Sequence, residues 1–165
     1  MRSLYLVSVW LHIMSAITWV GGMIFLVAVL VPLLRTPGLR AQAAELFHSV
    51  GTRFRTVGWL AITTLVVTGV FNVTARGYRL EQLLDGEAFA GRWGHTLALK
   101  LSLVATLVLM SGIHDFWLGP RATQLARGNA PPEQREKWRR IASFLGRAAF
   151  VLALAIVALA VTLVR

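Results

Sequence analysis

The stretch LYLVSVWLHIMSAITWVGGMIFLVAVLVPLL, residues 4–34, decides the fold class, because it contains one histidine, His12, and no Asp, Glu, Lys or Arg. A helix needs about 20 mainly apolar residues to cross the hydrocarbon core of a bilayer. Three further apolar blocks follow at residues 57–75, 96–113 and 148–164, and their only charged residue is Lys100. We therefore predict an all-α protein, an integral membrane bundle of four up-and-down helices that form a single transmembrane domain over residues 1–165.

Residues that break helices set the limits of these four segments. Pro32 and the Thr36-Pro37-Gly38 turn end the first helix, and Gly119-Pro120 is expected to break or bend the third. The expected helices cover residues about 4–34, 41–75, 92–118 and 133–164.

The distribution of charge predicts the topology. The 35–55 and 119–147 segments contain eleven Lys and Arg residues, whereas five lie at the termini and in the 76–95 loop, beside three acidic residues. By the positive-inside rule, the two basic segments are cytoplasmic, and both termini lie outside. The net charge of +10 therefore reflects membrane topology, and we expect no nucleic-acid partner. The absence of cysteine excludes disulfides, iron–sulfur clusters and covalent c-type haem attachment.

Ionisable side chains within the apolar blocks are candidates for function, because a central charge costs roughly 2.5–3.5 kcal/mol on insertion scales. The blocks contain His12, Lys100, His114 and Asp115, while His48 and His95 come just before the second and third blocks. A rise of about 1.5 Å per residue divides the candidates by depth. The expected outer group is His12 with His95 or Lys100, and the expected inner group is His114 with His48.

Helical spacing indicates which of these side chains face the interior. His12 and Trp19 share one helical face, and Lys100, Leu107 and His114 share another. We interpret Lys100 and His114, roughly 21 Å apart by helix rise, as the two ends of one interior surface.

Two chemistries fit such residues. Imidazoles on facing helices can hold a b-type haem, which needs axial ligands and an apolar slot, with Lys100 paired to a propionate or ligating in its neutral form. Copper is the alternative, since it accepts imidazole and thioether ligands such as His114 and Met110, one helical turn apart. The absence of any Met-rich or His-rich tract argues weakly against a copper relay. Proton transfer through histidine and aspartate is a third option.

Each candidate also has a purely structural interpretation. His48 and His95 can lie at the headgroups, and Lys100 can extend its ammonium outward along its stem. A helix–helix hydrogen bond accounts equally well for His12 or His114. Asp115 is expected to pair with an arginine of the cytoplasmic side, Arg121 or Arg147.

Two longer patterns resemble known families. LHIMSAITWVGGMIFLVAVLVPLLR (residues 11–35) and GHTLALKLSLVATLVLMSGIHDFWLGPR (residues 94–121) resemble the first and third helices of the CopD-like membrane proteins, which are named for copper resistance. A looser similarity extends to the HemJ-type protoporphyrinogen oxidases, four-helix proteins that bind haem b. This resemblance places His12 and Lys100 at the positions of the HemJ histidine and lysine, although His95 and Lys100 are five residues apart here, instead of two. It implies a small multi-pass protein of the bacterial inner (cytoplasmic) membrane.

These observations lead to one functional hypothesis and two alternatives. We expect a membrane protein that holds haem b, with His12, His114, His95, His48 and Lys100 as the candidate ligands, and that carries out electron transfer or porphyrin chemistry. The alternatives are a copper-binding or copper-transporting protein without haem, and an accessory membrane subunit. The residues leave open whether the chain is an enzyme, such as a haem-dependent oxidoreductase. The partners that fit are the lipid bilayer, a redox protein or quinone, and further copies of the chain.

Overall fold

The computed structural model describes residues 2–79, 81–82 and 85–162, and its regular structure in these ranges is entirely helical. Four of the helices are long and apolar enough to cross a membrane, which confirms the predicted fold class. In chain order, the elements are α1 (Arg2–Phe25), a π-helical turn (Leu26–Leu30), α2 (Val31–Leu33), α3 (Ala43–Thr74), a 3₁₀ turn (Glu87–Phe89), α5 (Gly91–Ile113), a second π-helical turn (His114–Leu118), α6 (Gly119–Arg127) and α7 (Pro132–Thr162).

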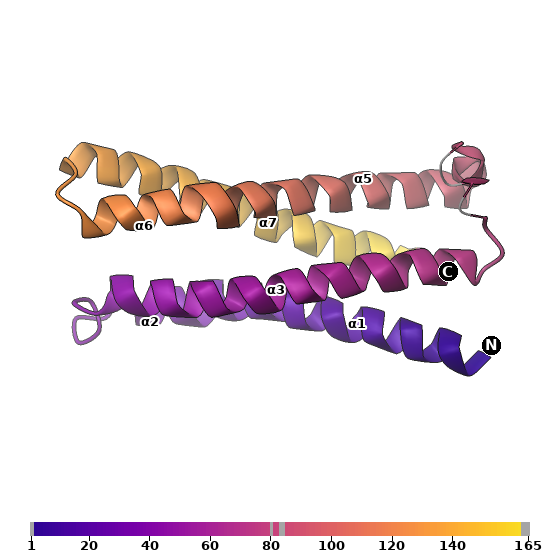
Figure 1. Cartoon of the computed structure of the whole chain (residues 1–165), viewed down its shortest axis with the longest axis horizontal. Coiled ribbons are helices and arrows are strands. Elements are labelled where there is room, and N and C mark those ends of the chain that lie inside the picture. The colour runs from indigo at the N-terminus through magenta and orange to yellow at the C-terminus, as the bar shows by residue number, and fades with distance from the viewer. Residues whose placement is uncertain (1, 80, 83–84, 163–165) are drawn as a thin grey trace.

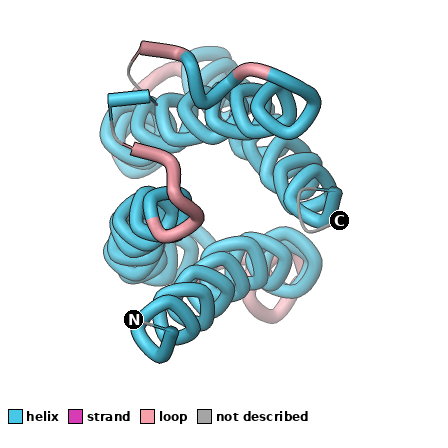
Figure 2. The backbone as a smooth tube through the Cα atoms, turned by 90° about the vertical axis from the view of Figure 1, so that its right-hand side faces the viewer, coloured by secondary structure: helices cyan, strands magenta, loops and turns pink. Residues whose placement is uncertain are grey.

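The bundle consists of two antiparallel helical hairpins. The helix α1 packs along α3, and α5 packs along α7, while α1 also contacts α7 and α6 contacts α3 (Figures 1 and 2). The helices α1 and α5 are therefore diagonal to each other. Both ends of the chain lie at one end of the bundle, beside the connection from α3 to α5 (Figure 1).

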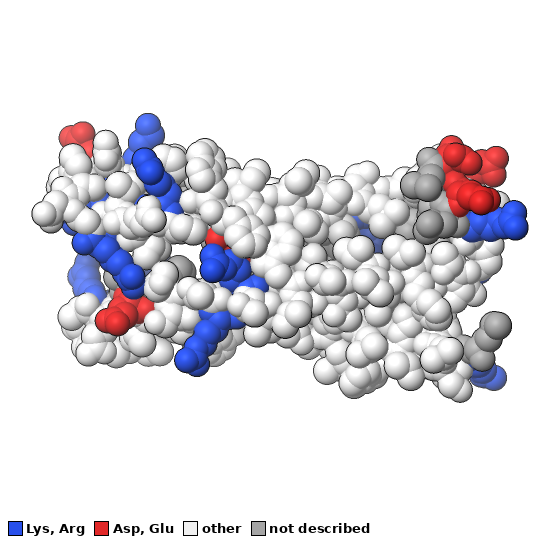
Figure 3. Space-filling model, viewed as in Figure 1, with Lys and Arg blue, Asp and Glu red and all other residues white. Residues whose placement is uncertain are grey.

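Apolar side chains cover most of the surface. In the most apolar stretch of each membrane span, few residues are buried inside the bundle, from 6% of them in the first span to 22% in the second. Lys and Arg gather toward the end that holds α2 and α6, and an uncharged band covers much of the remaining length (Figure 3). This pattern fits a bundle whose outer faces are solvated by lipid rather than by water.

Small residues allow the helices to approach closely at the centre of the bundle. The buried core contains Trp19 of α1, Leu107 of α5, and Ala149 and Ala153 of α7, and Leu107 is only 1% exposed. Trp19 lies on the predicted helical face of His12, and Leu107 lies on the face of Lys100 and His114 that was expected to be interior.

The two π-helical turns come before prolines. Each ends two residues before a proline, Pro32 or Pro120, which has no N–H to continue the helical hydrogen bonds. Gly119 is needed at the second turn, because a Cβ there would lie 3.0 Å from the carbonyl oxygen of His114.

Gly119-Pro120 do not end the third helix, which was expected to stop at about residue 118. The π-helical turn accommodates Pro120, and the helix continues through α6 to Arg127. The other expected limits agree with the structure to within two residues, apart from residues 163–164 of the last helix, which lie outside the described residues.

The polar first turns of α7 precede its apolar part and contain a local ion-pair cluster. Glu136 accepts hydrogen bonds from Nε of Arg139 at 2.8 Å and from Nε of Arg140 at 2.6 Å. These bonds, above all those from Arg139, lower the pKa of the Glu136 carboxyl to about 2. The carboxylate therefore stays ionised at neutral pH, and the two arginines keep their partner.

Candidate functional site

His12 of α1 is fixed against α3 by a hydrogen bond that defines its tautomer. Its Nδ1 lies 2.9 Å from Oγ1 of Thr68, a buried residue of α3. The single hydroxyl hydrogen of Thr68 is donated to the carbonyl of Thr64, at 2.6 Å. Nδ1 of His12 is therefore the donor in this contact, and Nε2 carries the lone pair.

A glycine of α3 makes room for this imidazole. A Cβ added at Gly69 would lie 3.4 Å from Cε1 of His12, so the ring rests directly on the α3 backbone. Such a close approach, together with the Thr68 bond, holds the ring in one orientation.

Lys100 of α5 faces the same region of the bundle. It acts electrostatically on His12, although α1 and α5 are diagonal to each other, and both side chains are about half-buried. Arg76, at the end of α3, lies within electrostatic range of Lys100. Among the described residues, Lys100 has no hydrogen bond or ion pair with an acidic group. The half of the bundle that contains the start of α1, which is the outer half in the predicted topology, therefore holds a cation and an anchored imidazole.

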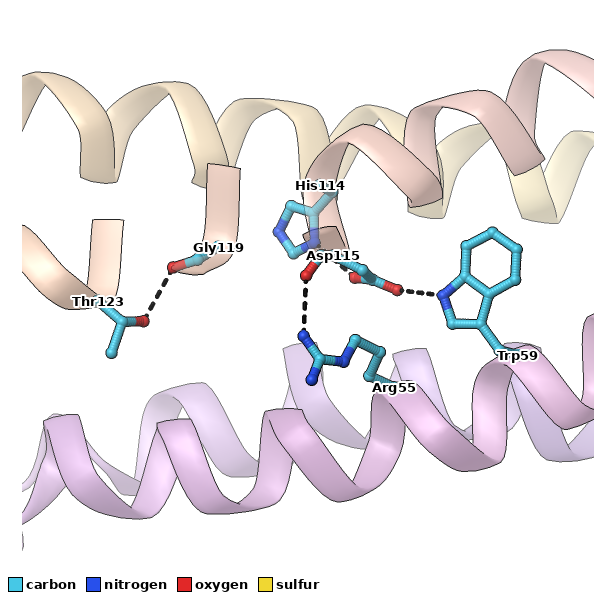
Figure 4. Close-up of polar contacts among 6 residues, drawn as sticks. All are labelled: Arg55, Trp59, His114, Asp115, Gly119 and Thr123. Carbon is cyan, nitrogen blue, oxygen red and sulfur yellow. Dashed lines mark hydrogen bonds and ion pairs between the residues drawn. The ribbon is translucent and has the colours of Figure 1, made fainter. Parts of the chain in front are cut away.

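His114 forms a second anchored imidazole, and its partner is an adjacent carboxylate. Nδ1 of His114 donates to Oδ1 of Asp115 at 2.9 Å, and Nε1 of Trp59 donates to Oδ2 of Asp115 at 3.1 Å (Figure 4). Arg55 donates from Nη1 to the backbone oxygen of Asp115 at 3.2 Å. Nε2 of His114 faces Gly146 of α7, where a Cβ would lie 3.5 Å away.

The expected pairing of Asp115 with Arg121 or Arg147 is wrong. The guanidinium of Arg121 stacks on Trp138, 5.7 Å from the ring centroid. Nε of Arg147 donates to the backbone oxygen of Ser143, one turn earlier in α7. The π-helical turn that begins at His114 rotates Asp115 toward α3, and Trp59 becomes its partner in place of an arginine.

The two anchored histidines belong to different depths of the bundle. His12 comes ten residues after the start of α1, roughly 15 Å along the axis, whereas His114 comes 23 residues after the start of α5, roughly 35 Å from the same end. They therefore cannot ligate one ion together.

His48 and His95 are both exposed, and no hydrogen bond joins either of them to His12 or His114 in the described part of the chain. Within the same residues, no group of three or more His, Cys, Asp or Glu side chains is placed to enclose a metal ion.

Comparison with known proteins identifies the family. The CopD family, described as copper resistance protein D, matches residues 48–163. A protein of Aquifex aeolicus (strain VF5) that carries the name "Uncharacterized protein" is 32% identical over 163 residues, which cover 98% of this chain and 94% of that protein. No solved structure matches the chain. The match to more than half of the sequence shows that this chain belongs to the CopD family of membrane proteins.

Proposed function

We propose that the chain binds haem b in the outer half of its bundle, with Nε2 of His12 as an axial ligand, and uses it for electron transfer or porphyrin chemistry. The observation that supports this proposal is the anchored imidazole of His12. Its Nδ1–H is held by Thr68, so its Nε2 carries the lone pair that a metal ligand needs. Histidine ligates haem iron through an unprotonated ring nitrogen. A hydrogen bond from the N–H of the other ring nitrogen orients the imidazole for this role.

Electrostatics favours haem over a bare copper ion at His12. Lys100 places positive charge near this imidazole, and Arg76 in turn lies within electrostatic range of Lys100, so the region disfavours a metal cation and favours an anionic ligand. A haem carries propionates that can pair with such cations. Gly69 adds to the fit, because its lack of a side chain lets the imidazole pack directly against α3. When bound, haem would supply a one-electron redox centre inside the membrane.

Copper is the second candidate, and the inner site suits it better than the outer one. The Asp115 carboxylate supplies a negative charge beside His114 and holds its Nδ1–H, which orients the imidazole. Met110 precedes His114 by four residues on the same helix and is half-buried, so it can add a thioether ligand. The CopD family description also points to copper.

The test is the absorption spectrum of the purified protein, produced with haem available, together with a pyridine haemochromogen assay and a copper determination. The proposal predicts a Soret band with about one haem per chain, and its loss in His12→Ala. The exposed His95 provides the matched control, and His95→Ala should keep the haem. A colourless protein with stoichiometric copper that is lost in His114→Ala would establish the second candidate instead. Neither haem nor copper would indicate an accessory subunit.

A further inference from the structure

Two buried polar atoms beside His12 lack a partner. The helices α1 and α3 are antiparallel, so the position one turn outward from the His12–Thr68 pair holds Ser8 on α1 and Asn72 on α3. Ser8 is only 8% exposed. Its Oγ and the Oδ1 of Asn72 are buried and have no hydrogen-bond partner.

The orientation of the Ser8 hydroxyl differs from that of other hydroxyls in the bundle. Thr18, Ser102 and Thr106 each donate to the carbonyl four residues earlier in their own helix, at 2.9 Å. This local bond is the usual solution for a hydroxyl in lipid. Ser8 forms no such bond, and a buried polar group without a partner is unfavourable. Its hydroxyl therefore has no partner among the residues that the structure describes.

Lys100 extends this polar cluster from the opposite hairpin. It lies within electrostatic range of His12 and also of Arg76, which follows Asn72 by one helical turn. Lys100 comes nine residues after the start of α5, roughly 14 Å along the axis, which is close to the depth of His12 and within about one turn of that of Ser8. A hydroxyl, an amide and an ammonium are together the donors that a carboxylate requires.

We infer that Ser8, Asn72 and Lys100 bind a carboxylate of the ligand that His12 holds. This inference rests on the proposed function and specifies its ligand as a tetrapyrrole with free carboxylates on the edge that faces the outer side. Ser8 donates its O–H, and Lys100 donates an N–H. Asn72 donates from its amide nitrogen after a half-turn of the amide, a rotation that exchanges two atoms of nearly equal size.

The experiment compares haem with haem dimethyl ester, which keeps the iron and the ring but has no carboxylate. Apoprotein in detergent is titrated with each ligand, and binding is followed at the Soret band. The wild type should bind haem at least about tenfold more tightly than the ester, as expected for charge-assisted hydrogen bonds. Ser8→Ala and Asn72→Leu should each reduce this preference and leave the affinity for the ester unchanged, and Lys100→Gln should reduce the preference as well. Ser15→Ala, on the inward side of His12 in the same helix, should retain the preference.

The outcomes separate the inference from the proposed function. If neither ligand binds, the proposed function is rejected, and the inference is rejected with it. If the wild type binds haem and its ester equally, haem binding stands and the carboxylate site is rejected. If Ser15→Ala loses the preference as fully as Ser8→Ala does, the effect is not specific to these residues and the assignment is also wrong. A variant that merely misfolds would lose the ester as well, so the ester titration reveals it.

Discussion

Nδ1 of His12 and Oγ1 of Thr68 lie 2.9 Å apart across the interface between α1 and α3. Because the hydroxyl hydrogen of Thr68 is already donated to Thr64, this contact fixes the histidine tautomer as well as its orientation. The binding of a ligand to Nε2 would therefore depend on Thr68, a residue that the ligand does not contact.

Thr68→Val should weaken ligand binding at His12 while preserving the volume of the side chain. Loss of a second-shell partner typically costs about 10- to 100-fold in metal affinity, and we expect a decrease of that order for haem. Haem titration of the apoprotein measures it. Thr63→Val is the control, since Thr63 is exposed on the same helix and bonds only the carbonyl of Trp59. Equal affinities of the two variants would show that Thr68 does not position His12.

The sequence was sufficient to predict the helices, because membrane-spanning helices are determined mainly by the order of apolar and charged residues along the chain. Apolar blocks without charge can be solvated only by lipid or by one another, so the number of spans and their approximate ends follow from hydropathy. The continuation past Gly119-Pro120 was missed because a single π-helical turn accommodates the proline, and nothing in the composition signals a π-helical turn.

The site was harder to predict because its partners come from other helices. His12 and Lys100 were identifiable as isolated polar residues in apolar blocks, whereas Thr68, Ser8 and Asn72 look like the ordinary small polar residues of a membrane helix. Only the register between α1 and α3 shows that they surround His12. A polar residue four positions from an intramembrane histidine, as Ser8 is, was the available signal.

Asp115→Asn should weaken copper binding at the inner site. The substitution removes the charge that favours a cation near His114 and alters the acceptor of its Nδ1–H. We expect the copper affinity to decrease by about 10- to 100-fold, measured by competition with a chromogenic copper chelator. Asp85→Asn is the control, because Asp85 is an exposed acid in the loop between α3 and α5. Haem binding at His12 should remain unchanged in both variants.

The predicted topology can be tested by cysteine labelling, because the natural chain contains no cysteine. Glu87→Cys and Gln124→Cys place single thiols at exposed positions at opposite ends of the bundle. By the positive-inside rule, a membrane-impermeant maleimide added to intact bacterial cells should label position 87. Position 124 should react only after lysis. The reverse pattern would place the basic segments outside and contradict the predicted orientation.

Gly22→Ala should destabilise the contact between α1 and α3. A Cβ at Gly22 would overlap the ring of Phe54, lying 2.8 Å from Cζ and closer still to Cε2, so the ring must move. Overpacking of this kind typically costs about 1–3 kcal/mol, measurable as a lower free energy of unfolding in detergent.

The neighbouring glycine provides the matched control. A Cβ at Gly21 would meet no atom within 4 Å, so Gly21→Ala should leave the free energy of unfolding nearly unchanged or raise it slightly, since alanine favours a helix. The double variant Gly22→Ala with Phe54→Leu should recover part of the lost stability, because the smaller side chain removes the overlap. If both alanine variants were equally stable, α1 and α3 would not be packed in the register that places Ser8 opposite Asn72 and His12 beside Thr68. The same two glycines thus test the geometry on which the outer site depends.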